Sequence, residues 1–234
     1  MYPRSPIPDE SGKQSGAVDI AGVIYDDKGH PGGQVNDRLS VQTENQETAE
    51  QSGAIVSTYP IKVGPGLYQV RVAVRDERSG RMGNANAWVE IPDLTAQKLS
   101  LSSLIMGDGK DVSDPSTKKR SRDPFDQVNL NVDRRYLQNS NLRLMLFAYN
   151  ARLAETTSEP DVAIKIEVLH NEKAVVSAPF KPISTKGISN LEQLPYAADI
   201  PLSGLVRGHY ELKVTVLDRL AKNSISQITQ FEIE

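Results

Sequence analysis

The chain of 234 residues contains 38% hydrophobic and 24% charged residues and carries a formal net charge of −3, which is ordinary for a globular protein. So small a charge creates no global field for nucleic acid or acidic membranes, and no stretch approaches the about 20 apolar residues of a membrane span. Cysteine is absent, which excludes thiol catalysis, thiolate metal sites and disulfides.

The N-terminal third begins with a polar segment and continues with two predicted strands. Residues 1–15 are rich in Pro and Ser and lack the apolar region of a signal peptide, so we expect a disordered leader, as at the start of a fragment of a longer protein. A strand is predicted at Ile20–Tyr25, followed by a turn at Asp26–Gly29. Another is predicted at Ile55–Val63, where Pro60 lacks a backbone donor and indicates a sheet edge.

Alternation with a period of two predicts the remaining strands. Tyr68–Val74, Val162–Val168 and Tyr210–Val216 each place apolar residues on one side and polar residues on the other, as in antiparallel sheets with one buried face. Leu142–Tyr149 is apolar on both sides and predicts a central strand. A second turn is expected at His170–Lys173. No window of similar length has a helical stripe, so the fold class is all-β.

An internal repeat indicates two copies of one unit. Residues 66–91 align without a gap with residues 208–233, and seven of the 26 positions are identical, where unrelated segments give about one or two. The identical pairs are Gly66/Gly208, Tyr68/Tyr210, Val72/Val214, Val74/Val216, Asp76/Asp218, Glu90/Glu232 and Ile91/Ile233. At the same offset Asp19–Ala21 meets Asp161–Ala163. The alternative of two unrelated amphipathic hairpins stays open.

The start and end of each repeat suggest structural roles. In Greek-key sandwiches a tyrosine near the start of the penultimate strand buries its ring and hydrogen-bonds to backbone at a sheet corner. A preceding glycine permits a tight turn, and aspartate at a strand end accepts hydrogen bonds from turn amides. Six residues are therefore expected to be structural: Gly66, Tyr68, Asp76, Gly208, Tyr210 and Asp218.

The repeat predicts two immunoglobulin-like (Greek-key) β-sandwich domains in tandem, residues 16–94 and residues 97–234. Domain 2 contains additional predicted strands at Leu99–Ile105 and Val128–Val132. Between these strands Gly107–Asp126 is polar and rich in charge, so we expect a flexible surface loop.

No residue pattern indicates catalysis. His30, His170 and His209 stand singly, outside any metal-ligand spacing, and we expect solvated side chains. A G-x-S-x-G nucleophile elbow is absent, and no helix is expected to hold a phosphate loop. We therefore predict that the chain is not an enzyme and has no catalytic residue, no cofactor and no metal.

Two charged clusters are also interpreted as ordinary surface segments without a bound ligand. The acidic cluster Asp108–Asp114 lacks the spacing and closing glutamate of an EF-hand, so we expect no calcium site there; calcium at the domain junction stays an alternative, because extracellular β modules use such sites. The basic run Lys118–Arg122 is flanked by Asp114 and Asp123. It predicts a solvated loop, and no nucleic-acid partner is expected.

Seven motifs carry a family resemblance that spans nearly the whole chain from Val18: Gly66–Asp76, Gly80–Gly83, Trp88–Leu94, Val132–Arg135, Phe147–Asn150, Leu194–Ala198 and Val216–Arg219. In these motifs the chain resembles the C-terminal region of bacterial von Willebrand factor A-related domain proteins. The metal motif of the A domain, D-x-S-x-S, has only a distant counterpart at Asp111–Ser116, with the wrong spacing. The resemblance implies an extracellular or periplasmic accessory module and transfers no catalytic residue.

Together these patterns favour a non-catalytic extracytoplasmic binding or spacer module that mediates protein–protein contact, accessory to a von Willebrand A-type adhesion protein. One alternative is a carbohydrate-binding accessory module of a secreted enzyme, which usually displays several exposed aromatic residues on one face; this chain has one Trp, eight Tyr and four Phe. Another is a hydrolase with a carboxylate-lined cleft between the domains.

Overall fold

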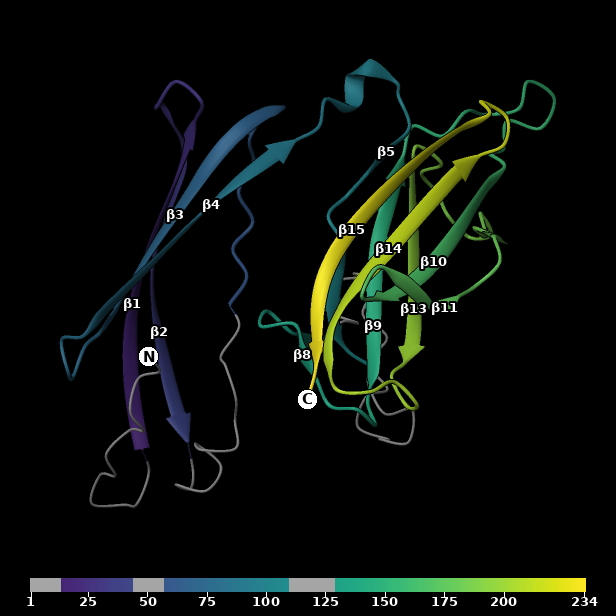
Figure 1. The fold of residues 1–234 in the computed structure, drawn as a ribbon. Helices are drawn as coiled ribbons and strands as arrows, with labels where there is room; N and C mark the ends of the chain where they lie inside the picture. Colours follow the sequence, from purple (N-terminus) through teal and green to yellow (C-terminus); the bar gives the residue numbers. More distant parts are fainter. Residues whose placement is uncertain (1–13, 44–56, 110–128) are drawn as a thin grey trace. The chain divides into compact units, whose positions relative to one another are not determined.

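The computed structural model describes residues 14–43, 57–109 and 129–234. This part of the chain is all-β, as predicted, and its only helical element is the short 3-10 turn η1 (Leu94–Ala96). The chain divides into two compact units, residues 1–93 and residues 94–234 (Figure 1). The described residues contain no helix that is long and apolar enough to span a membrane.

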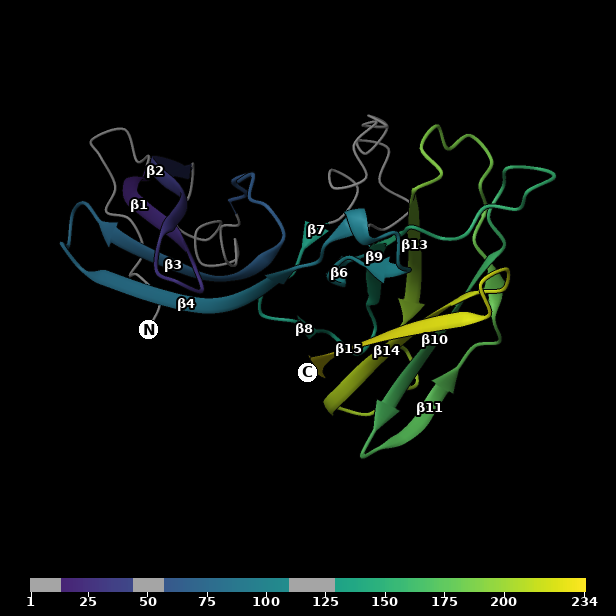
Figure 2. The same cartoon turned by 90° about the horizontal axis from the view of Figure 1, so that it is seen from above.

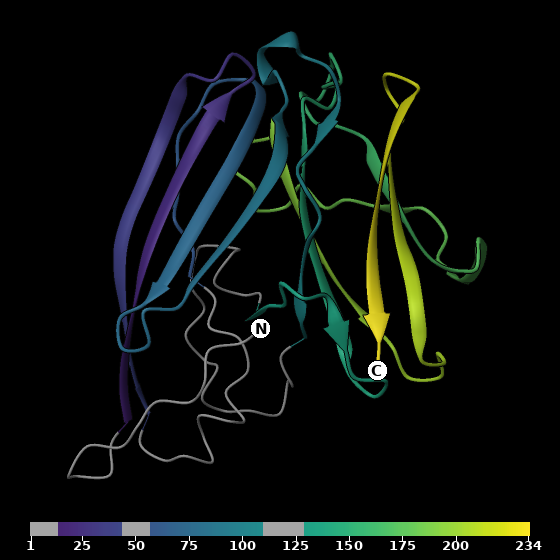
Figure 3. The same ribbon diagram turned by 60° about the vertical axis from the view of Figure 1, so that its left-hand side comes forward.

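The described part of unit 1 forms a four-stranded antiparallel sheet in the order β2-β1-β3-β4 (Figure 3). Its strands are β1 (Gln14–Asp26), β2 (Pro31–Thr43), β3 (Gly66–Asp76) and β4 (Met82–Ile91). The sequence pattern did not predict β2, because its many glycine and polar residues hide the alternation. The predicted leader of residues 1–15 extends too far, because Gln14 and Ser15 already belong to β1. Residues 1–13 lie outside the described residues.

The strand expected at Ile55–Val63 is not a strand in its described part. Residues 57–65 have no ladder partner, and Pro60 could not donate to one. The segment lies over β2 instead. The side chain of Ile61 lies against Gly33, and that of Val63 lies against Gly32. A Cβ atom at either glycine would contact these side chains. Residues 55 and 56 lie outside the described residues.

In the described part of unit 2, two sheets pack face to face (Figure 2). One has the order β11-β10-β14-β15-β8, with β12 beside β10, and the other has the order β13-β9-β6-β7, with β5 beside β9. The bounds are β5 (Ser100–Leu101), β6 (Ile105–Asp108), β7 (Asn129–Leu130), β8 (Arg135–Tyr136), β9 (Asn141–Tyr149), β10 (Val162–His170), β11 (Lys173–Ser177), β12 (Lys181–Pro182), β13 (Gln193–Pro201), β14 (Gly208–Asp218) and β15 (Asn223–Ile233).

The hydrophobic core of unit 2 lies between these sheets. Leu142, Leu144 and Leu146 of β9 and Leu212 and Val214 of β14 are completely buried. Each such side chain contributes about 1.5–3 kcal/mol relative to an exposed position. Met145 and Phe147, on the other side of β9, are also buried, as its continuous apolar sequence predicted.

Several predicted boundaries of unit 2 need correction. The strand expected at Leu99–Ile105 is two short strands, because the chain leaves the ladder between β5 and β6. The start of the loop expected at Gly107–Asp126 was predicted too early in the chain, because Gly107 and Asp108 complete β6. Residues 110–128 lie outside the described residues, and the strand expected at Val128–Val132 is reduced to β7.

The internal repeat is visible in the strand register. Tyr68 is opposite Val89 in unit 1, and Tyr210 is opposite Phe231 in unit 2, as the alignment predicts. The first strand of each unit departs from the alignment. Val18 is opposite Asp76, and Val162 is opposite Asp218, so the structural counterpart of Val18 is Val162 and not the aligned Pro160. This shift of two residues keeps the same side chains on the same face.

Candidate functional site

Unit 2 has a tyrosine corner at the start of β14. The hydroxyl of Tyr210 donates a 2.6 Å hydrogen bond to the carbonyl of Val206, and the side chain is only 2% exposed. Gly208 has a φ of 145°, which suits glycine. The ring of His170 stacks on Tyr210 at 4.6 Å and its Nδ1 lies 3.0 Å from the carbonyl of His209. His170 is therefore a packing residue and not simply a solvated turn residue.

The matching corner of unit 1 is built differently. Gly66 has a φ of 148°, and Tyr68 is half-buried, with its ring against Gly66 and Gly32. Among the described residues the hydroxyl of Tyr68 donates no hydrogen bond. The two tyrosines thus share a position in the repeat but differ in how their hydroxyl groups are satisfied.

Asp218 and Asp76 each close a turn at the end of a strand. Asp218 is 1% exposed and accepts backbone hydrogen bonds from Leu220 at 3.0 Å, Ala221 at 2.9 Å and Arg152 at 2.7 Å. Asp76 accepts one from Ser79 at 2.7 Å, and this bond lowers the pKa of its carboxyl group. The aspartate of unit 2 also joins the turn to a distant segment.

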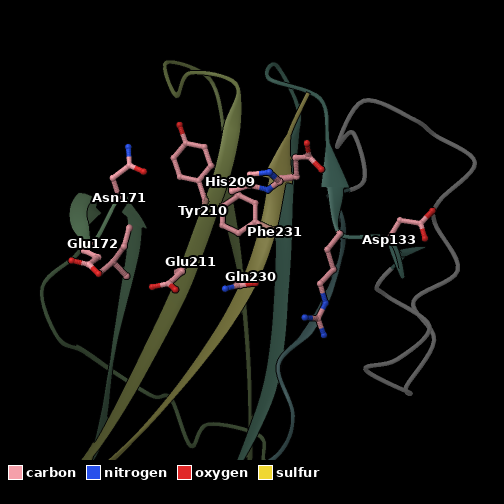
Figure 4. Close-up of a pocket in the computed structure, with 11 residues that line it drawn as sticks. Asp133, Asn171, Glu172, His209, Tyr210, Glu211, Gln230 and Phe231 are labelled. Atoms are coloured by element: carbon pink, nitrogen blue, oxygen red, sulfur yellow. The ribbon is translucent and has the colours of Figure 1, made fainter. Parts of the chain in front are cut away.

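An open depression of about 480 Å³ lies beside the tyrosine corner of unit 2 (Figure 4). Tyr210 and Phe231 supply its aromatic part, and four carboxylate side chains line it with His209 and Arg134: Asp133, Glu172, Glu211 and Glu232. Arg135 forms ion pairs with Glu232 at 3.4 Å and with Glu234 at 3.2 Å. Among the described residues no group of three or more His, Cys, Asp and Glu side chains could hold a metal ion.

The same place in unit 1 carries aromatic residues that the sequence analysis did not single out. In unit 2, Leu169, Glu211 and Gln230 form a row across three strands at the depression. The matching row in unit 1 is Tyr25, Gln69 and Trp88. Trp88 is 58% exposed, and the guanidinium group of Arg71 lies 5.1 Å from the centre of the Tyr25 ring.

The outward face of the unit 1 sheet, on which this row lies, is otherwise polar. Arg38 bonds to Asp19 at 2.8 Å and to Glu77 at 3.1 Å. The bond from Arg38 lowers the pKa of the Asp19 carboxyl group. His30 lies in the exposed β1–β2 turn, with its Nδ1 3.1 Å from Asp26.

The opposite face of this sheet, here called the apolar face, is the most unusual surface of the described chain. It carries Val18, Ile20, Gly22 and Ile24 of β1, Gly33, Val35, Asp37 and Leu39 of β2, Tyr68, Val70, Val72 and Val74 of β3, and Gly83, Ala85, Ala87 and Val89 of β4. Asp37 is its charged member and accepts a hydrogen bond from Tyr59. Val74 is 38% and Val89 is 36% exposed, whereas the matching Val216 and Phe231 of unit 2 are 0% and 3% exposed. Gly22 and Ile24 of the same face are buried, and the segment of residues 57–65 lies over it at β2, so the exposed part of the apolar face lies along β4 and the end of β3.

The six residues expected to be structural therefore occupy strand starts and strand ends in both units. The glycine and the tyrosine of each unit share one corner, and the aspartate closes the turn at the other end of the same strand. The depression and the apolar face emerge only from the pairing of strands. No protein-family model matches this chain, and no curated protein matches it.

Proposed function

We propose that the chain is a non-catalytic binding module of two immunoglobulin-like β-units that acts by protein–protein contact. One observation carries the proposal: on the apolar face of unit 1 Val74 and Val89 are exposed, whereas unit 2 buries the matching Val216 and Phe231. An apolar surface of this extent marks an interaction site in proteins. Burial of that face in a protein contact would be favourable by about 25 cal/mol per Å².

The family resemblance of the sequence supports a cellular location and a parent protein for this contact. We place the module outside the bacterial cytoplasm, as an accessory region of a von Willebrand A-type adhesion protein. In this setting neighbouring β-domains of one protein or of an assembly supply apolar partners. The polar outward face and the depression in unit 2 stay in contact with water.

Thiol reactivity tests whether the apolar face is available for contact. The chain has no cysteine, so Val74→Cys introduces a single thiol on the apolar face, and Asn86→Cys introduces one on the outward face of β4. In dilute solution we expect both thiols to react with a water-soluble disulfide reagent at similar rates. Slow reaction of Val74→Cys at every dilution would show that the chain already covers this face, and the proposal would be wrong.

The row of Tyr25, Gln69 and Trp88 favours a second candidate, carbohydrate binding. The exposed ring of Trp88 and the half-buried ring of Tyr25, beside the amide of Gln69, suit the apolar faces and hydroxyl groups of a sugar. Native electrophoresis in gels that contain laminarin or xylan tests this function. Retardation that is lost in Trp88→Ala but kept in Gln230→Ala, the matching position of unit 2, would support it; unchanged mobility in both gels would remove it.

A further inference from the structure

The apolar face of unit 1 lacks the second sheet that covers its counterpart in unit 2, as far as the described residues extend. In unit 2 the face of β10, β14 and β15 packs on a sheet that contains β9 and β13. We infer that a second copy of this chain covers the apolar face, so that two unit 1 sheets pack face to face as a symmetric dimer. This inference rests on the proposed function and names its partner.

The whole face is of the size that one partner buries in a specific interface, and the segment of residues 57–65 occupies part of it at the β2 edge. A sheet of four strands of about 11 residues measures about 36 Å by 19 Å, or about 700 Å². Specific interfaces bury about 800 Å² on each partner. Two antiparallel sheets can pack with their strands nearly aligned and form a common core about 10 Å thick.

The two edges of the apolar face are complementary in bulk. At the β2 edge the segment of residues 57–65 adds side chains above the sheet: Ile61 lies over Gly33, and Tyr59 donates a 2.7 Å hydrogen bond to Asp37. At the β4 edge the same rows end in Gly83, Ala85 and Ala87, which leave a shallow surface. A bulky edge fits a shallow edge, whereas two bulky edges would hold the sheets apart.

This complementarity selects one symmetry for the dimer. A twofold axis parallel to the strands places β2 of one copy opposite β4 of the other and β1 opposite β3. An axis across the strands would place β2 opposite β2. With the first axis, Val72 of one copy lies over Gly22 of its partner, and Val35 lies over Ala85, since these four residues form one row across the sheet.

Sedimentation of the full chain from micromolar to millimolar concentration tests the inference. We expect the mass to double with concentration in the parent chain and in Asn86→Lys, and to stay that of a monomer in Val74→Lys. Both variants add one positive charge, and because Val74 is 38% exposed, the lysine can extend into water without unfolding the sheet. Circular dichroism melts confirm that both variants fold.

Cross-linking of introduced thiols provides a second measurement that does not depend on a disruptive variant. Under the proposed symmetry, the Val72→Cys side chains of the two copies lie near the twofold axis on facing sheets about 10 Å apart, which is too far for a disulfide. A short bismaleimide should therefore link them into a covalent dimer, whereas it should not link Asn86→Cys on the outward face. A parent chain that stays monomeric throughout, or a Val74→Lys variant that dimerises like the parent, would overturn the inference. If the Val74→Cys thiol is still as reactive as that of Asn86→Cys in such a monomer, the proposed contact function stands and its partner is a different protein.

Discussion

The hydroxyl of Tyr210 donates a 2.6 Å hydrogen bond to the carbonyl of Val206, four residues earlier in the chain. This bond fixes the entry of the chain into β14, the central strand of its sheet, at a place where the ring is buried between His170 and Phe231. It provides the most specific link between one residue of the sequence and the fold of unit 2.

Replacing Tyr210 by Phe should reduce the free energy of unfolding of unit 2 by about 1–3 kcal/mol, because the ring still packs while the carbonyl of Val206 loses its donor. Tyr68→Phe should change stability by less than about 0.5 kcal/mol, since the hydroxyl of Tyr68 donates no hydrogen bond within the described residues. Denaturant melts measure both. Equal losses in the two variants would contradict the difference between the corners.

Tyr136 offers the opposite case. It is 2% exposed, its ring packs edge-on against Phe231 at 6.0 Å, and its hydroxyl has no partner in the described chain. Tyr136→Phe should therefore be neutral or stabilising, since it removes a buried polar group without leaving an unpaired partner.

The pH dependence of stability provides a separate check on Tyr136. Burial raises the pKa of its phenol group, whereas an unfolded tyrosine ionises at about pH 10. A group whose pKa is raised in the folded state stabilises the folded protein at pH values below its unfolded pKa. This contribution is lost as the pH rises from about 10 toward the folded pKa. The parent chain should lose stability more steeply above pH 10 than Tyr136→Phe; parallel pH profiles from urea melts would show that the tyrosine ionises freely.

The sequence predicted strands where one face is buried and polar residues alternate with apolar ones, as at Val162–Val168 and Tyr210–Val216. It did not predict β2, because glycines and polar side chains mask the alternation there, or that Ile61 would pack on Gly33 instead of joining a ladder. The depression depends on residues from separate elements, such as Glu172 of the β10–β11 turn, Glu211 of β14 and Gln230 of β15. No local pattern brings them together, so strand order and register were needed to find it.

Asp218 should be far more important for stability than its counterpart Asp76. Asp218→Ala leaves three backbone N–H groups without their acceptor in a buried position, and a loss of about 3 kcal/mol is expected. Asp76→Ala removes the acceptor of the Ser79 and Arg78 backbone N–H groups at a more exposed turn, where water can replace it, and should cost less than about 1 kcal/mol. Thermal melts of the two variants measure this difference; equal losses would show that the burial of Asp218 and its bond to Arg152 add nothing to the turn.

The division of the chain predicts how its two halves behave in isolation. Residues 94–234 close their own core between two sheets, so this fragment should fold alone and melt cooperatively at the temperature of the corresponding transition in the full chain. Residues 1–93 contain one sheet in their described part, and single-layer sheets with an exposed apolar face are poorly stable. That fragment should therefore show little cooperative melting when dilute and gain it as its concentration rises. Calorimetry of both fragments and of the full chain over a range of concentrations provides the measurement. A dilute fragment of residues 1–93 that melts as sharply as residues 94–234 would mean that its apolar face is already closed from within.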